Sequence, residues 1–286
     1  MVGLNINGEK MYSRVYVEIT NICNKSCSFC PGHDRTPRRM SVEEFERVTD
    51  SLVGVTKYIY YHLMGEPTTH PQLCELIKIA GKKGFNSAVT TNGTLLGRVG
   101  DELIEAGVYK VNISVHSFEG QDERAYLEYL DTCFDFADKA SKAGVLTVMR
   151  LWNKGFDGGR NLDIVARLKE RFADGEWKES PTGARIRHRL HLEYGDRFAW
   201  PDMGAEDSGN NVFCYGLSDH FSVLCDGTVV PCCLDRNGDM ALGNIFEDNI
   251  WDVLGSDRAK NIAEGFKAHT AREELCRKCG YARRFK

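Results

Sequence analysis

Cysteine is the residue type in this chain whose number and spacing point most directly to chemistry. The sequence holds eleven cysteines. Cys74 and Cys133 stand apart, and the others form two groups: Cys23, Cys27 and Cys30 in the first, and Cys214, Cys225, Cys232, Cys233, Cys276 and Cys279 in the second. In a reducing compartment such groups indicate metal ligation rather than disulfides. The sequence therefore predicts two metal sites in two regions of the chain.

The first group, Cys23-Asn-Lys-Ser-Cys27-Ser-Phe-Cys30, directly follows a short apolar run. Three thiolates on a tight loop can hold three corners of a [4Fe-4S] cluster, and no fourth cysteine lies nearby to close it. One iron would then be open to a ligand. A zinc loop is the alternative, although zinc normally takes four ligands with paired spacings.

The second group ends in the pair Cys276-Arg-Lys-Cys279. A Cys-x-x-Cys pair serves both iron-sulfur clusters and four-cysteine zinc sites, so the residues alone leave both open. Cys225 and Cys233 are candidates for a different role. Each is either a small buried apolar side chain or a catalytic thiol that returns a hydrogen atom to a substrate radical.

The elements that would position these groups follow an alternating pattern. Apolar runs and longer helical patterns alternate from about residue 15 to residue 193, which is typical of βα units around a parallel sheet. We predict strands over 15–20, 58–63, 87–91, 110–116, 145–152 and 186–193, and helices beginning at Ser41 and over 73–80, 101–107, 120–144 and 161–174. The fold class is α/β, a partial (β/α)6 barrel of the TIM type. The first cysteine group would lie at the carboxyl end of its sheet, where active sites of such barrels lie.

Polar side chains share one face of several predicted strands. They are Asn112, Ser114, His116, Arg150, Arg187, Arg189, His191 and Glu193. Parallel strands are usually apolar on both faces, so a polar inner face predicts a wet cavity for a ligand. The alternative is that these strands lie at an edge with one face in solvent. We expect Arg187, Arg189 and His191 to contact an anionic group of a substrate.

A segment rich in Gly, Asp, Ser and Asn over 204–211 predicts a linker. We therefore expect two domains, 1–203 and 204–286. In the second, Asp226-Gly227 lies between two apolar runs, which indicates a β-hairpin, and a helix is predicted over 250–265.

Composition excludes several classes of protein. The chain of 286 residues carries 37 basic and 41 acidic residues, which are interspersed, so neither nucleic acid nor an anionic membrane is favoured as a partner. No apolar run is long enough to span a bilayer, and residues 1–10 lack the core of a signal peptide. We expect a cytoplasmic protein.

The spacing C-x-x-x-C-x-x-C after a first strand resembles the radical S-adenosylmethionine (SAM) superfamily, with Phe29 in the aromatic position before Cys30. The resemblance implies that SAM chelates the open iron through its amino and carboxylate groups. Reduction of the cluster then cleaves SAM to methionine and a 5'-deoxyadenosyl radical, which abstracts hydrogen from a substrate. The protein aims that radical and excludes competing reactions. A flavodoxin- or ferredoxin-type electron donor is implied as a partner.

Further positions resemble the family in the same order along the chain. Met64-Gly65-Glu66-Pro67 is similar to a Gly-Gly-Glu motif that holds the SAM amino group, with methionine in place of the first glycine. A carboxylate such as Glu66 suits an ammonium, and a guanidinium fork suits the SAM carboxylate. The SAM-binding residues that the resemblance implies are Phe29, Gly65, Glu66, Asn92, Ser114 and Arg150.

Cys214, twelve residues, Gly227, four residues and Cys232, followed later by Cys276 and Cys279, resembles the twitch form of the SPASM auxiliary domain. The resemblance implies a hairpin and a helix around one additional [4Fe-4S] cluster held by these four cysteines. A cluster closed by four thiolates has no iron free for substrate, which points to electron transfer. The implied cofactors are therefore two [4Fe-4S] clusters and SAM.

Several reactions are compatible with this reading. The favoured one is dehydrogenation of a small molecule, in which the auxiliary cluster accepts an electron. A radical epimerase or a crosslinking enzyme acting on a peptide is the alternative, and a non-enzymatic iron-sulfur or zinc binding module is an alternative of another class. Because the first predicted strand begins by Val15, we expect no leader-peptide module before it, which favours a small molecule or a free-standing peptide segment. His116 and Glu193 are further candidates for substrate contacts.

Overall fold

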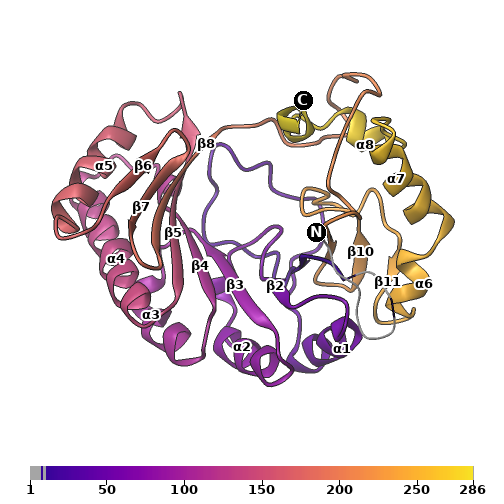
Figure 1. Cartoon of the computed structure of the whole chain (residues 1–286), viewed down its shortest axis with the longest axis horizontal. Coiled ribbons are helices and arrows are strands. Elements are labelled where there is room, and N and C mark those ends of the chain that lie inside the picture. Colours follow the sequence, from indigo (N-terminus) through magenta and orange to yellow (C-terminus); the bar gives the residue numbers. More distant parts are fainter. Residues whose placement is uncertain (1–7, 9–10, 286) are drawn as a thin grey trace.

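An eleven-stranded sheet curves through the molecule, as the computed structural model in Figure 1 shows. The structure describes residue 8 and residues 11–285. The strands are β1 Arg14–Val17, β2 Tyr58–Tyr60, β3 Asn86–Thr91, β4 Lys110–Ser114, β5 Leu146–Lys154, β6 Lys178–Ser180, β7 Gly183–Arg187, β8 Leu190–Asp196, β9 His220–Val223, β10 Thr228–Val230 and β11 Gly243–Asn244. Their order in the sheet is β11-β10-β9-β1-β2-β3-β4-β5-β8-β7-β6.

Helices cover the convex outer face of the sheet (Figure 1). The α-helices are α1 Val42–Leu52, α2 Leu73–Lys82, α3 Leu96–Glu105, α4 Glu123–Lys142, α5 Arg160–Arg171, α6 Ile250–Leu254, α7 Asp257–Lys267 and α8 Glu274–Arg277. Short 3-10 helices span Pro67–Thr69, Val115–Ser117 and Tyr281–Phe285. In the described part of the chain, no helix combines the length and apolar character needed to cross a membrane.

The parallel strands β1 to β5 and β8 form the predicted partial barrel, which confirms the fold class. Side chains alternate between the two faces of each strand, and this explains how the sheet packs on the helices. The outward side chains, such as Val15, Ile59, Val89 and Val111, are fully buried against the helices. The capping box that begins α1 is present as predicted. The backbone N–H of Glu44 donates to Ser41 Oγ at 3.1 Å, and the backbone N–H of Ser41 donates to Glu44 Oε2 at 2.8 Å.

The prediction of one strand over 186–193 is wrong. The chain turns there: β7 ends at Arg187, Arg189 adopts a left-handed conformation with φ of 62°, and β8 begins at Leu190 and pairs antiparallel with β7. The turn carries no glycine, and apolar residues at Ile186, Leu190 and Leu192 keep an alternating pattern on both sides of it. Alternation alone therefore could not reveal the reversal.

The carboxyl-terminal elements extend the same sheet. The predicted hairpin is present as β9 and β10, and β9 pairs parallel with β1. The predicted helix over 250–265 is two helices, because α6 ends at Leu254 with Gly255 as its C-cap, and Ser256 begins α7 as its N-cap, where Oγ accepts from the backbone N–H of Ala259. The segment 204–211 has no helix or strand of its own, but the boundary between the domains 1–203 and 204–286 stays a prediction. Residues 1–7, 9–10 and 286, which those ranges include, lie outside the described residues.

Candidate active site

The loop that follows β1 carries the first cysteine group at the carboxyl end of the strand. Cys23 and Cys30 are exposed and Cys27 is half-buried, and none of the three is in a disulfide. Burial and the nearby Glu119 carboxylate raise the pKa of Cys27 to about 11, and Cys23 and Cys30 add to the shift. Three thiols thus lie close enough to influence one another, and a metal that binds them must displace their protons.

Neighbouring loops hold this cysteine loop in place. The side-chain amide of Asn92, after β3, donates to Asn24 Oδ1 at 2.8 Å, and Asn24 donates to Thr94 at 2.9 Å. On the other side, Glu119 accepts hydrogen bonds from the backbone and hydroxyl of Ser28. The loop is therefore fixed by side chains that follow β3 and β4.

Glu66 organises the loop after β2. Its side chain is 2% exposed; Oε1 accepts from the backbone and hydroxyl of Thr68, and Oε2 accepts from the backbone N–H of Asn92 at 2.6 Å. Its own backbone N–H donates to the carbonyl of Ile22 at the start of the cysteine loop. The predicted contact of Glu66 with the SAM amino group stays a prediction. Glu66 links the loop after β2 to the loop after β3 through its carboxylate, and to the cysteine loop through its backbone N–H.

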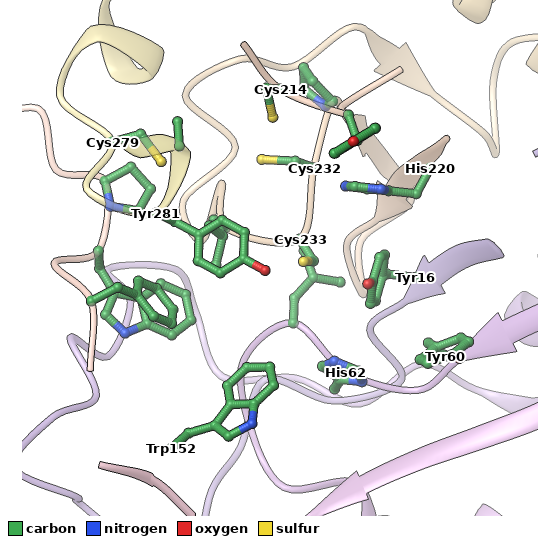
Figure 2. A pocket seen from close by; sticks show the side chains of 18 of the residues that line it. Tyr16, Tyr60, His62, Trp152, Cys214, His220, Cys232, Cys233, Cys279 and Tyr281 are labelled. Carbon is green, nitrogen blue, oxygen red and sulfur yellow. The ribbon is translucent and has the colours of Figure 1, made fainter. Parts of the chain in front are cut away.

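The second cysteine group comes together from three separate segments. Figure 2 shows the sulfur atoms of Cys214, Cys232 and Cys279 directed toward the same space. Cys276 is near enough to contribute to the raised pKa of the Cys232 thiol. Burial is the largest cause of that raised pKa, followed by the charge of Cys214. The hairpin β9–β10 positions Cys232, and α8 positions Cys276. The four thiols predicted as ligands are thus neighbours in the fold.

Residue type indicates which metal groups the cysteines suit. Within the described residues, no three or more His, Cys, Asp or Glu side chains are placed to hold one metal ion. Thiolates are the usual ligands of [4Fe-4S] clusters, and both cysteine groups fit such a cluster in residue type.

A cavity of about 720 Å³ connects the inner face of the barrel with the second cysteine group. Its wall includes Phe29, Ser114, His116, Arg150, Glu193, Cys214, Cys232, Cys233, Cys276 and Cys279. This volume lies in the usual range for a small-molecule site. A cavity is present at the inner face, and four of the predicted polar residues line it, Ser114, His116, Arg150 and Glu193, whereas Asn112 does not. The alternative of a solvent-exposed edge is not supported at β4 and β5.

The predicted SAM side of the cavity is partly organised. Phe29 and His116 lie with ring centroids 5.1 Å apart, and the ring of His116 contacts the backbone carbonyl of Arg150 through Nδ1 at 3.0 Å. The Arg150 guanidinium lies 4.5 Å from the centre of the Trp152 ring and donates to Glu193 at 3.3 Å. These contacts place an aromatic pair and a guanidinium on one wall, and the assignment of these residues to SAM stays a prediction.

Several predicted substrate residues lie elsewhere. Arg187 points to α4, where it pairs with Asp138 at 2.5 Å, and Arg189 lies in the β7–β8 turn with its guanidinium over the ring of Tyr109. The turn described above is the physical reason, since it takes both residues off the inner face. His191 lines a separate hollow near β6 and β7. Glu193 lines both that hollow and the main cavity.

The two candidate hydrogen donors also separate. Cys225 is 1% exposed, does not line the cavity, and has its thiol 3.7 Å from the Arg35 guanidinium. Cys233 lines the cavity and lies close enough to Tyr16 for that hydroxyl to lower the pKa of its thiol, which burial raises to about 11. Figure 2 shows Cys233 between the second cysteine group and His62.

Sequence reasoning missed a set of inner-face residues on the first strands. These are Arg14, Tyr16, Tyr60, His62 and Lys110. The signal was available, because Arg14 and Tyr16, Tyr58 and Tyr60, and Lys110 and Asn112 follow the same alternation that revealed Ser114.

A partial barrel with three thiols on the loop at the carboxyl end of β1, and four more in the wall of the cavity that Phe29 of that loop also lines, is the arrangement expected of an enzyme with two iron-sulfur sites. Two family profiles match the chain: the Radical SAM superfamily over residues 17–152, and the SPASM iron-sulfur cluster-binding domain over residues 214–280. The chain belongs to the radical SAM superfamily and is an enzyme with an SPASM domain. Its cofactors are a [4Fe-4S] cluster and SAM, with additional iron-sulfur clusters bound by the SPASM domain.

Known proteins agree with this assignment. A probable GTP 3',8-cyclase of Sulfurisphaera tokodaii is 34% identical over 136 residues, which are 45% of this chain and 43% of that protein. The chain spans about half the length of the relatives it matches, or less. Solved structures share the fold: BtrN in complex with AdoMet and 2-DOIA (TM-score 0.61, 20% identity, 94% of this chain and 93% of that chain) and anSMEcpe with bound AdoMet and Cp18Cys peptide (TM-score 0.59, 15% identity, 94% and 86%).

Proposed function

We propose that this enzyme abstracts hydrogen from a small organic molecule and oxidises it, with an auxiliary [4Fe-4S] cluster as electron acceptor. The observation that carries the proposal is the single cavity, which joins Phe29, Ser114 and Arg150 on one side to the four clustered cysteines on the other. When bound, the first cluster and SAM supply one-electron cleavage of SAM and hydrogen abstraction. A substrate in this cavity would lie near both the SAM site and the auxiliary cluster.

The protein's own residues position and enclose the reactants. Cys23, Cys27 and Cys30 would hold the first cluster, and Cys214, Cys232, Cys276 and Cys279 the second. Phe29 and His116 offer aromatic faces 5.1 Å apart for the adenosine part of SAM. Glu193 and Trp152 fix the Arg150 guanidinium, which suits the SAM carboxylate. Gly65, Glu66 and Asn92 would act by holding the cysteine loop in register.

The substrate proposal follows from the cavity. Its volume of about 720 Å³ suits a small molecule. The structural neighbours bind either kind of substrate, since one holds 2-DOIA and another a Cys-containing peptide. We favour the small molecule, with electrons delivered by a flavodoxin or ferredoxin in the cytoplasm, where thiols stay reduced.

A second candidate function has one specific observation in its favour. Cys233 lines the cavity close to Tyr16, so its thiol could return a hydrogen atom to a substrate radical, as an epimerase requires. Cys225 is outside the cavity and is not proposed for this role. Turnover in D2O separates the two functions: an epimerase incorporates one solvent deuterium into carbon and the Cys233→Ser variant does not, whereas a dehydrogenase incorporates none at the abstracted position.

Production of 5'-deoxyadenosine tests the proposed class of reaction in this chain. Anaerobically reconstituted protein, given dithionite and SAM, should release 5'-deoxyadenosine, and Cys27→Ala should release none. Cys74→Ala is the matched control, because Cys74 is half-buried on α2 and lies outside both cysteine groups. Wild-type protein that carries full iron but forms no 5'-deoxyadenosine would refute the proposal.

A further inference from the structure

The cavity carries an excess of positive charge. Among the described residues that line it, four are cations, Arg14, Lys110, Arg150 and Arg197, and two are carboxylates, Asp219 and Glu193. Asp219 already pairs with Arg14 at 2.6 Å and accepts from Ser13, and Glu193 pairs with Arg150. The two carboxylates are thus occupied by two of the cations, and Lys110 and Arg197 remain without a carboxylate partner among the described residues.

Lys110 is the cation in the cavity wall that most requires an anionic partner. It begins β4 on the inner face, and the register places Ala88 of β3 and Leu146 of β5 beside it, neither of which can accept a hydrogen bond through its side chain. Burial lowers the pKa of Lys110, and Arg150 lowers it further, while Glu193 acts in the opposite direction. A half-buried ammonium without a counterion is unfavourable, and an anion in the cavity would relieve that.

His62 lies among the same charges. Its Nδ1 is buried and has no hydrogen-bond partner among the described residues. Burial and the positive charges of Arg150, Lys110 and Arg14 lower its pKa to about 3, so the imidazole is neutral and can donate through one nitrogen. Figure 2 shows His62 beside Tyr16 and Tyr60, whose ring centroids lie 5.2 and 6.1 Å from that of His62. We name Arg14, His62 and Lys110 the cationic cup.

Arg14 and Lys110 lie deeper in the barrel than the residues predicted for SAM, and His62 follows β2. Lys110 begins β4 and Ser114 ends it, and four residues of a parallel strand span roughly 13 Å. The cysteine loop likewise follows β1, whereas Arg14 begins that strand. The Arg150 guanidinium is near enough to lower the pKa of both His62 and Lys110. The cavity wall also carries aromatic side chains, among them Tyr281 and Trp200, which pack against Phe198.

We propose that the cationic cup of Arg14, His62 and Lys110 binds an anionic group, a carboxylate or a phosphate ester, on the organic substrate of this enzyme. The proposal rests on the proposed function only in taking the cavity as the substrate site. It also restores the anionic substrate predicted from Arg187 and Arg189, on different residues. All three residues line the same cavity: Lys110 supplies an ammonium without a carboxylate partner among the described residues, Arg14 a guanidinium that also pairs with Asp219, and His62 a neutral N–H donor. Such donors suit an anionic group.

Binding of three ring-bearing probes tests the proposal. Benzoate, phenyl phosphate and benzamide are titrated into the anaerobically reconstituted protein by calorimetry; benzamide is the neutral counterpart of benzoate, and the other two distinguish carboxylate from phosphate. Wild-type protein should bind at least one anion at least about tenfold more tightly than benzamide, the size expected for a charged hydrogen bond. Lys110→Met should remove that preference, Lys110→Arg should retain most of it, and Lys78→Met, on the exposed face of α2, should leave it unchanged.

The contrary outcomes are equally distinct. Equal binding of all three probes by the wild type, or an undiminished preference in Lys110→Met, overturns the proposal. SAM cleavage is measured in parallel in the wild type and in Lys78→Met, and both should form 5'-deoxyadenosine at the same rate. Displacement of the anionic probes from the wild type by SAM would assign the cup to SAM and also overturn the proposal. Wild-type protein that prefers the anions but forms no 5'-deoxyadenosine refutes the proposed function and supports the cup.

Discussion

At the scale of single residues, Gly65 is the clearest case of a side chain that must be absent. It has a φ of +74°, and a Cβ at this position would lie 2.4 Å from the carbonyl oxygen of Thr20 and 2.8 Å from the carbonyl carbon of Asn21. The backbone of the loop after β2 therefore presses directly against the residues that lead into the cysteine loop. Glycine is the residue that permits both the left-handed backbone and this approach.

Gly65→Ala should therefore disturb the first cluster more than the fold as a whole. We expect iron at the first site to fall and 5'-deoxyadenosine formation to drop by about a hundredfold, because small displacements of reacting groups carry that penalty. Gly84→Ala is the matched control, since Gly84 has a φ of +85° but nothing within 4 Å of an added Cβ. It should lower the free energy of unfolding by about 1–2 kcal/mol and leave activity intact. Equal activity in the two variants would contradict this account.

Residues with a specific local pattern were predictable from the sequence, and residues defined by long-range placement were not. Ser41 and Glu44 form the predicted cap, and the cysteine spacing placed Cys23, Cys27 and Cys30 on the loop after β1. The partners of Glu66 lie on two other loops, and no spacing in the sequence reveals them. The role of Lys110 depends on which residues flank it in the sheet, which is decided by strand register.

At the scale of elements, the reversal between β7 and β8 gives Arg187 a structural role. Its Nη2 donates to Asp138 Oδ1 at 2.5 Å and to Ser141 Oγ at 2.9 Å, and both residues belong to α4. The side chains of Arg187 and Asp138 are 19% and 17% exposed, so this pair is shielded from solvent more than most ion pairs of the molecule. It fastens the β7–β8 hairpin to the outer helix layer.

Arg187→Met should destabilise the fold without changing the chemistry. We expect the free energy of unfolding to fall by about 1–3 kcal/mol, the range for hydrogen bonds to charged groups, while 5'-deoxyadenosine formation stays at the wild-type rate. Arg124→Met is the control on the same helix, because Arg124 and Glu128 are 89% and 65% exposed and their pair should contribute less than about 0.5 kcal/mol. Thermal and denaturant unfolding measure both. A large loss of SAM cleavage in Arg187→Met would restore it to the active site.

Three elements meet at the carboxylate of Glu18, just after β1. Glu18 is fully buried; Oε2 accepts from Arg35 at 2.7 Å and from the backbone N–H of Met64 at 3.1 Å, and Oε1 accepts from the backbone N–H of Cys225 at 3.3 Å. These donors come from the segment after the cysteine loop, the loop after β2, and the turn of the β9–β10 hairpin. Glu18 therefore joins the two cysteine-bearing regions.

Removal of Arg35 should leave a buried charge without its counterion. Arg35→Met should lower the free energy of unfolding by about 3–5 kcal/mol, and the double variant Glu18→Gln with Arg35→Met should lose less, because no isolated charge then remains. Chemical denaturation of the wild type, both single variants and the double variant yields the coupling free energy. Simple additivity of the two substitutions would show that the pair does not act as a unit.

At the scale of the whole molecule, the pairing of β9 with β1 brings the hairpin that carries Cys232 beside the strand that leads into the first cysteine loop. The paired residues, such as Tyr16 and Ser222, are more than 200 positions apart in the sequence. Spacing along the chain defined both cysteine groups, and Asp226-Gly227 predicted the hairpin, which is present as β9 and β10. The strand pairing that joins them could not be predicted, because nothing local in either strand specifies its partner. That pairing places Tyr16 of β1 against Cys233 after β10.

This architecture predicts that the two clusters are separable in function. Cys276→Ala with Cys279→Ala should remove the auxiliary cluster, so that iron falls from about eight to about four atoms per chain. SAM cleavage with dithionite should continue, because Cys23, Cys27 and Cys30 and the loops that hold them are untouched. Oxidation of a substrate should stop, since no acceptor for its electron remains in the cavity wall.

The measurement combines iron and sulfide analysis with the yield of 5'-deoxyadenosine and of oxidised product for each equivalent of SAM. Cys74→Ala controls for loss of a thiol and should keep all three values. If the double variant still forms oxidised product at the wild-type yield, the auxiliary cluster is not the electron acceptor.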